Sequence, residues 1–73
     1  MPQKPMKSAQ ELLDMYYLEM RCNLLEVAAT LDRIEAAGGT DDPRLQRLLE
    51  AATIGLDDKP DRARRFLEAL SEE

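Results

Sequence analysis

Residues 9–37 read AQELLDMYYLEMRCNLLEVAATLDRIEAA, an uninterrupted stretch without proline or glycine. Ser8 and Glu11 have the spacing of a capping box, in which each side chain accepts a hydrogen bond from the other residue's backbone amide. Gly38 and Gly39 follow the stretch, and glycine ends helices because it adopts left-handed backbone conformations at little cost. We therefore expect one helix over residues 9–37, about 43 Å long at about 1.5 Å per residue.

A second, shorter helix is expected after the glycines. Asp42 followed by Pro43 is typical of an N-cap and a first helical residue. Leucine and alanine then recur at helical spacing as far as Gly55, which is a natural residue for the end of a helix. The pattern predicts a helix over residues 43–55.

The segment from Asp57 to Pro60 offers a new cap with proline in the first turn, so a third helix is expected over residues 59–71. Three arginines make this helix locally basic, but nearby acids compensate them, and we interpret the cluster as a solvated face. Acids and bases four residues apart stabilise a helix by a few tenths of a kcal/mol. The expected pairs are Asp61 with Arg65 and Arg64 with Glu68.

The three expected helices define an all-α fold. The two later helices, laid end to end, come to roughly 40 Å, close to the length of the first. The simplest arrangement is a helical hairpin, in which the two shorter helices fold back antiparallel on the long one. Residues 8–73 would form this single domain, and residues 1–7, with two prolines and no periodicity, are expected to be a disordered tail.

Two rows of apolar residues run along the long helix, with centres about 150° apart around its axis. A helix on the outside of a globular protein shows one apolar stripe and one broad polar face, so two rows indicate cover on two sides. The first apolar row consists of Leu13, Tyr17, Met20, Leu24, Val27, Leu31 and Ile34. The second apolar row consists of Met15, Leu18, Cys22, Leu25, Ala29 and Ala36, and Asp32 interrupts it.

The second apolar row is the candidate interface, because the returning arm of a hairpin covers only the first. One interpretation is a homodimer with a four-helix core. A second is a compact three-helix bundle, with one of the shorter helices on each row. A third is an adaptor or regulatory subunit of a larger complex, whose second row binds another helical protein.

The amino-acid composition argues against several classes of function. The chain has 73 residues, one cysteine and no histidine, so we expect no internal disulfide, no zinc site and no cofactor. Its net charge of -5 repels nucleic acid. The apolar runs fall far short of the ~20 residues that span a bilayer, and no signal-type segment follows Lys7. With the unpaired Cys22, these features favour a cytoplasmic protein.

Paired acids are the one hint of catalysis. Glu11 lies one turn from Asp14, as Asp32 does from Glu35, and such pairs on facing helices bind divalent metals in some helical bundles. In this spacing the chain resembles the all-α nucleotide pyrophosphohydrolases, which implies a metal-dependent nucleotide hydrolase as an alternative. The chain lacks that family's second acidic helix and its length, so we expect a non-catalytic interaction module with no catalytic residue.

Overall fold

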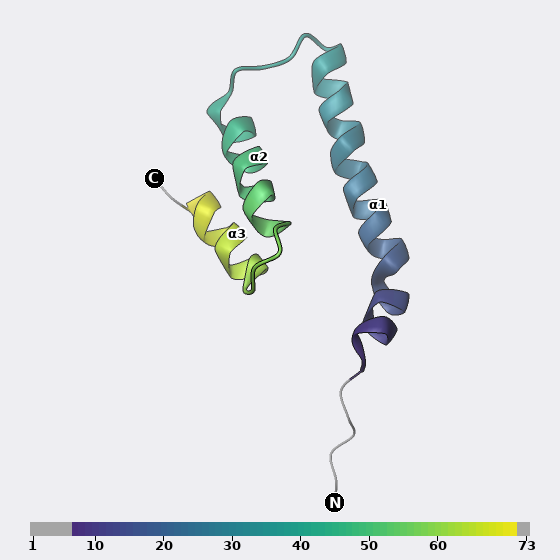
Figure 1. The fold of residues 1–73 in the computed structure, drawn as a ribbon. Coiled ribbons are helices and arrows are strands. Elements are labelled where there is room, and N and C mark those ends of the chain that lie inside the picture. Colours follow the sequence, from purple (N-terminus) through teal and green to yellow (C-terminus); the bar gives the residue numbers. More distant parts are fainter. Residues whose placement is uncertain (1–6, 72–73) are drawn as a thin grey trace, which may run out of the picture. The chain divides into compact units, whose positions relative to one another are not determined.

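The computed structural model describes residues 7–71 as three α-helices joined by two short connections (Figure 1). The helices are α1 (Ala9–Ala36), α2 (Pro43–Gly55) and α3 (Arg62–Ser71). Residues 7–71 contain no strand. The prediction of an all-α fold is confirmed. The tail predicted over residues 1–7 lies, except for Lys7, outside the described residues.

Local sequence signals set both ends of α1. The hydroxyl of Ser8 accepts a hydrogen bond from the Glu11 amide at 3.1 Å, and the Ser8 amide donates to Glu11 Oε1 at 2.8 Å, so the predicted capping box is present. The helix ends at Ala36, one residue before the predicted end. Gly38 and Gly39 follow with φ values of 110° and 74°, the left-handed conformations expected of them.

The predicted bounds of α2 are confirmed, although Gly55 plays another part than expected. Asp42 caps the helix by accepting the Arg44 amide hydrogen bond at 2.8 Å, and Pro43 is the first helical residue. Gly55 is the last residue of α2 but keeps an ordinary negative φ. A Cβ at this position would lie 3.2 Å from Cδ1 and 3.3 Å from Cβ of Phe66, so Gly55 gives α3 room to approach.

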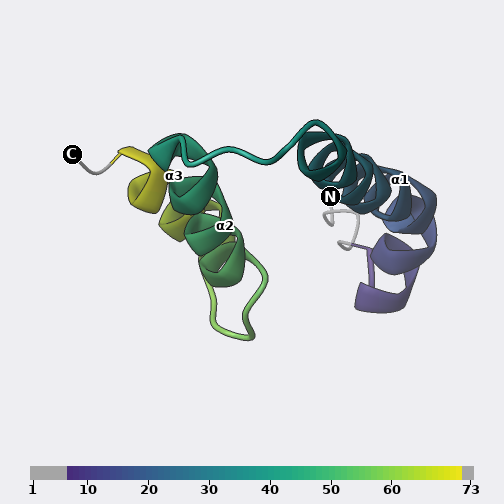
Figure 2. The same ribbon diagram turned by 90° about the horizontal axis from the view of Figure 1, so that it is seen from above.

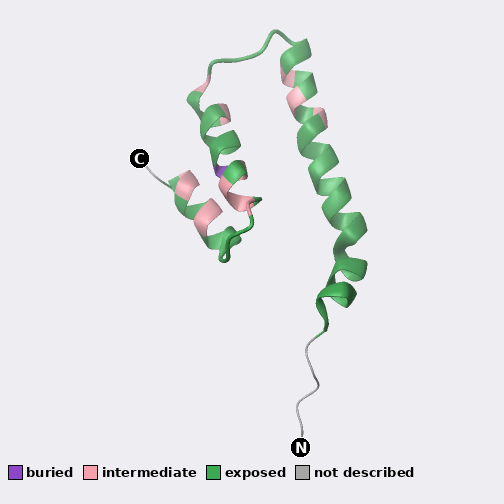
Figure 3. Cartoon of the chain, in the orientation of Figure 1, coloured by how far each residue is buried: buried purple, intermediate pink, exposed green. Residues whose placement is uncertain are grey.

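The chain divides into two compact units, Met1–Gly38 and Gly39–Glu73. Within the second unit α3 runs back beside α2, and the two helices pack together (Figures 1 and 2). Ala51 is the one buried residue in the described part of the chain, and Phe66 and Leu70 of α3 are half-buried (Figure 3). The single domain predicted for residues 8–73 stays a prediction.

The third helix begins at Arg62, three residues after the predicted start at residue 59. The carboxylate of Asp57 accepts the Lys59 amide hydrogen bond at 3.0 Å, which makes a turn of the kind that competes with helix formation. Asp61 then adopts a left-handed conformation with φ of 61°. Its carbonyl accepts the Arg65 amide, so the first helical hydrogen bond forms only from Asp61 onward.

The ion pairs of α3 follow the prediction in part. Arg64 pairs with Glu68 at 3.1 Å, as expected. The expected pair of Asp61 with Arg65 is wrong, because Asp61 pairs with Arg64 at 3.1 Å and the guanidinium of Arg65 turns back toward Asp57. The left-handed backbone at Asp61 lies outside the helix, so the four-residue spacing rule does not apply there.

Candidate protein-interaction surface

The second apolar row lies along one side of α1, because the helix is unbroken from Ala9 to Ala36 and the helical repeat keeps the row's residues aligned. Its large side chains are exposed: Met15 at 51%, Leu18 at 68% and Leu25 at 61%. The small members differ slightly, since Cys22 and Ala36 are exposed and Ala29 is half-buried. The structure therefore places all six predicted interface residues on α1 and shows an apolar surface there.

Most side chains of the first apolar row are also exposed. Tyr17, Met20, Leu24 and Val27 are exposed, whereas Leu31 and Ile34 near the end of the helix are half-buried. None of the residues of α1, all of which the structure describes, is buried, and the helix is almost wholly exposed along its length (Figure 3). A lone helix cannot bury apolar side chains, and most helical stability in proteins comes from packing an apolar face. The rows are thus surfaces that need cover.

The unit formed by α2 and α3 also leaves apolar side chains in contact with solvent. Leu56 and Leu67 are 69% and 60% exposed. Units shorter than about 40 residues usually need a disulfide, a metal or association with another surface in order to fold. Gly39–Glu73 is of that size and buries only Ala51 completely among its described residues. Each unit by itself therefore has too small a core.

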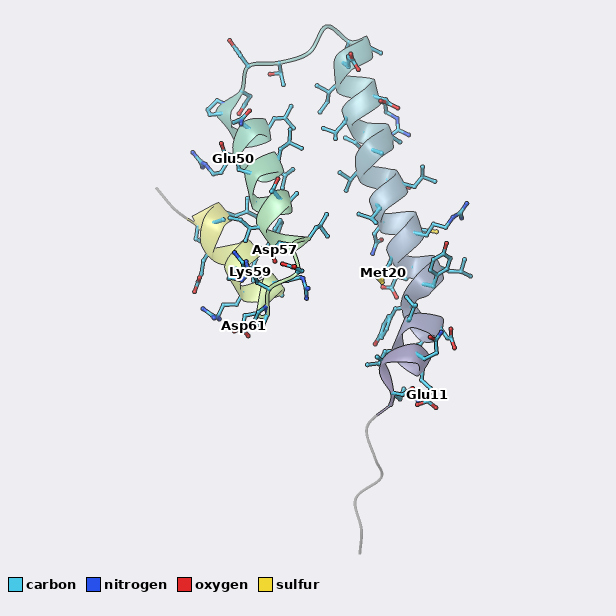
Figure 4. All side chains as sticks on the ribbon, viewed as in Figure 1. Glu11, Met20, Glu50, Asp57, Lys59 and Asp61 are labelled. Carbon is cyan, nitrogen blue, oxygen red and sulfur yellow. The ribbon has the colours of Figure 1, made fainter. Side chains whose placement is uncertain are left out.

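The two acidic pairs of α1 differ in their surroundings. Glu11, labelled at the start of α1 in Figure 4, forms the capping box with Ser8, and the carboxylate of Asp14 accepts a hydrogen bond from the side-chain amide of Gln10 at 3.0 Å. Asp32 and Glu35 are exposed. Between residues 7 and 71 the structure contains no group of three or more acidic, cysteine or histidine side chains placed to hold a metal ion.

The connection between α2 and α3 contains a charged cluster that the sequence did not reveal. Arg65 donates two hydrogen bonds to the carboxylate of Asp57, at 2.9 Å and 2.7 Å, and two more to the carbonyls of Lys59 and Pro60. Arg62 also donates to the carbonyl of Asp57. Asp57, Lys59 and Asp61 accordingly gather at this end of the unit (Figure 4).

The hydrogen bonds of this cluster shift the pKa values of Asp57 and Arg65. The hydrogen bonds from the Arg65 guanidinium, followed by the bond from the Lys59 amide, hold the pKa of Asp57 well below its usual range. The same pair raises the pKa of Arg65. Because four donor bonds of Arg65 are already engaged within the chain, we interpret the cluster as a structural clasp for the connection. No periodicity rule relates residues eight apart across a loop, so the sequence carried no signal for it.

None of the described helices is both long and apolar enough to cross a membrane. No protein-family model, curated protein or solved structure matches this chain. The geometry of α1 and of the α2–α3 unit is therefore the basis for the functional argument.

Proposed function

We propose that this chain is a small, non-catalytic interaction module that associates with a second copy of itself through the second apolar row of α1. The observation that carries the proposal is the exposure of Leu18 and Leu25, 68% and 61%, on a helix that buries none of its residues. Extended apolar surface of this kind is typical of interaction sites.

The proposal includes an antiparallel hairpin within each chain, in which α2 and α3 cover the first apolar row. Two features support it. The first row has no polar interruption, as expected for a row buried permanently. A complementary apolar row is available on α2, where Leu45 and Ala52 are half-buried and Leu49 is 39% exposed. The dimer would then contain a four-helix core with α1 of each copy at its centre.

Magnitudes indicate how strong the association should be. Fully burying a leucine or methionine side chain contributes about 1.5–3 kcal/mol, and Met15, Leu18 and Leu25 are 51%, 68% and 61% exposed. Six such side chains in two copies then contribute about 5–11 kcal/mol. Association costs on the order of 4–15 kcal/mol in translational and rotational freedom. At the favourable end of these two ranges the net gain is about 7 kcal/mol, which corresponds to a dissociation constant of about 10 micromolar, so we expect a dimer whose population changes at micromolar concentrations and above.

Replacing Leu25 with glutamate tests the proposal directly. A buried carboxylate without a partner is strongly unfavourable, so Leu25→Glu should weaken the dimer by at least about 100-fold. Sedimentation equilibrium over a range of protein concentrations measures this change. The matched control is Asn23→Glu, which adds the same side chain to the exposed polar strip of α1 two residues away and should leave the dissociation constant nearly unchanged.

Two results would contradict the proposal. One is a helical wild-type chain that remains monomeric at millimolar concentration. The other is equal weakening by Leu25→Glu and Asn23→Glu, because it would show that charge on α1, and not the second apolar row, controls association. Native mass spectrometry of the protein from its own cells adds an independent check. A stoichiometric complex with a different protein would contradict self-association and would favour the adaptor function.

A further inference from the structure

We propose that α3 is a releasable helix, which the clasp between Arg65 and Asp57 holds against α2. When the clasp opens, α3 leaves α2 and unfolds, while α1 and most of α2 stay helical. Release of α3 requires no second copy of the chain, so it is independent of the proposed self-association. The clasp is then a conformational device within the α2–α3 unit, because it selects between a docked and a released α3.

The apolar packing of α3 against α2 is slight. None of the residues of α3, all of which the structure describes, is fully buried, and Phe66, Ala69 and Leu70 are half-buried. Ala51 of α2 is fully buried, but its side chain is a single methyl group. Little apolar surface therefore holds the two helices together. A helix of ten residues is unstable in water without such packing, so an undocked α3 unfolds.

Arg65 adds the hold that the packing lacks, because it joins the first turn of α3 to the end of α2. Asp57 lies two residues after Gly55, the last residue of α2, and its carboxylate accepts hydrogen bonds from Arg65 at 2.9 Å and 2.7 Å. The carbonyls of Lys59 and Pro60 accept two more, at 2.9 Å and 2.8 Å. Paired bonds between guanidinium and carboxylate are about twice as strong as neutral hydrogen bonds. This one side chain thus fixes the path of the connection.

The direction in which the chain enters α3 also depends on the clasp. Asp61 has φ of 61°, a left-handed conformation that is costly for residues other than glycine and persists only where surrounding contacts hold it. With the clasp open, Asp61 can return to an ordinary backbone conformation, which changes the direction of α3. The contact of Phe66 with Gly55 is close, since a Cβ on Gly55 would lie 3.2 Å from Phe66 Cδ1. A change of direction therefore separates the two helices.

Hydrogen exchange of the full-length protein, followed by NMR at one pH and one protein concentration, tests the release of α3. Asp57→Ala removes the carboxylate, and Arg65→Lys keeps the positive charge but cannot form the two parallel bonds. In both variants we expect the backbone amides of residues 66–71 to exchange at least about 10-fold faster than in the wild type, since loss of one hydrogen bond to a charged group has that effect. Amides within α1 should keep their wild-type rates.

Asp58→Ala is the matched control, because it removes a carboxylate from the next residue, which is exposed. Its exchange rates in α3 should equal those of the wild type. Wild-type rates at residues 66–71 in Asp57→Ala and Arg65→Lys would overturn the proposal. Equal acceleration in α2 and α3 would also overturn it, because the α2–α3 unit would then open as a whole. Acceleration by the same factor in α1 would mean that the clasp stabilises the entire chain and not the docking of α3.

Discussion

Arg65 shows how one side chain can determine where a helix begins. Its guanidinium reaches across eight residues to the carboxylate of Asp57, and both side chains are largely shielded, at 25% and 29% exposure. The carbonyls of Lys59 and Pro60 also accept hydrogen bonds from Arg65. These contacts hold the connection in a non-helical form, so α3 begins only after Asp61. The clasp is thus worth more to the shape of the α2–α3 unit than a surface ion pair of two free side chains.

The clasp predicts a specific dependence of stability on pH. The pKa of Asp57 is lowered in the folded chain, so the folded state favours the ionised form and gains stability at any pH above the ordinary carboxyl value of about 3.9. This contribution should decline as the pH falls below that value and vanish below the lowered pKa. Asp57→Asn should therefore unfold at lower urea concentration than the wild type at pH 7, with the difference shrinking in acid.

Asp58→Asn is the matched control for this experiment, because it removes the same charge from the next residue, which is exposed. Its urea midpoint should stay close to that of the wild type at pH 7. A difference between Asp57→Asn and the wild type that persists unchanged at pH 2 would mean that Asp57 acts through its shape and not through its charge.

At the scale of the helix, the capping box of α1 offers a clean measurement. Replacing Ser8 with alanine removes the acceptor for the Glu11 amide, and loss of such a cap costs about 1 kcal/mol. For a chain of this size we expect the thermal midpoint to fall by about 4–8 °C. Circular dichroism melting checks the shift. Ser8→Asp should keep the wild-type midpoint because aspartate also caps helices, and equal losses in both variants would rule out the cap as the cause.

The helices also show which parts of the structure follow from sequence alone. Caps and glycines near Ser8, Gly38 and Asp42 act on adjacent residues, so the bounds of α1 and α2 could be predicted to within a residue. The start of α3 could not, because it depends on Arg65 reaching Asp57 through space. Gly55 was identified as the end of α2, but its contact with Phe66 is a tertiary feature that no local pattern contains.

The sequence likewise predicts one property of the candidate interface and leaves another open. Helical periodicity is enough to place Leu18, Leu25 and Ala29 on one side of α1, and the structure bears out that placement on an unbroken helix. What covers the side depends on the shape and charge of a second surface, which the periodicity of one helix does not describe. The dimer therefore stays a prediction, as do the cytoplasmic location and the absence of catalysis.

At the scale of the whole molecule, the small core allows the stability to depend on protein concentration. Ala51 is the one fully buried residue between residues 7 and 71, so the proposed association would bury apolar surface that neither unit buries by itself. A partner that binds only the folded state raises its stability in proportion to the logarithm of concentration. We expect the thermal midpoint of the wild type to rise on going from about 1 to about 100 micromolar protein, as differential scanning fluorimetry can measure.

Leu25→Glu provides the comparison for that measurement. If the proposed interface stabilises the fold, this variant should melt at a lower temperature and show no dependence on concentration. A wild-type midpoint that is constant over the same range would show that the monomer is stable by itself, and would favour the compact three-helix bundle.

The pair of glycines after α1 has one more consequence. Nothing lies within 4 Å of where a Cβ would stand on Gly38 or Gly39, yet both have positive φ, so backbone handedness and not crowding excludes ordinary side chains there. A mirror-image amino acid favours that same handedness and would find open space around it. D-alanine introduced at this joint by chemical synthesis would reduce the freedom of the unfolded chain while leaving the folded backbone undisturbed.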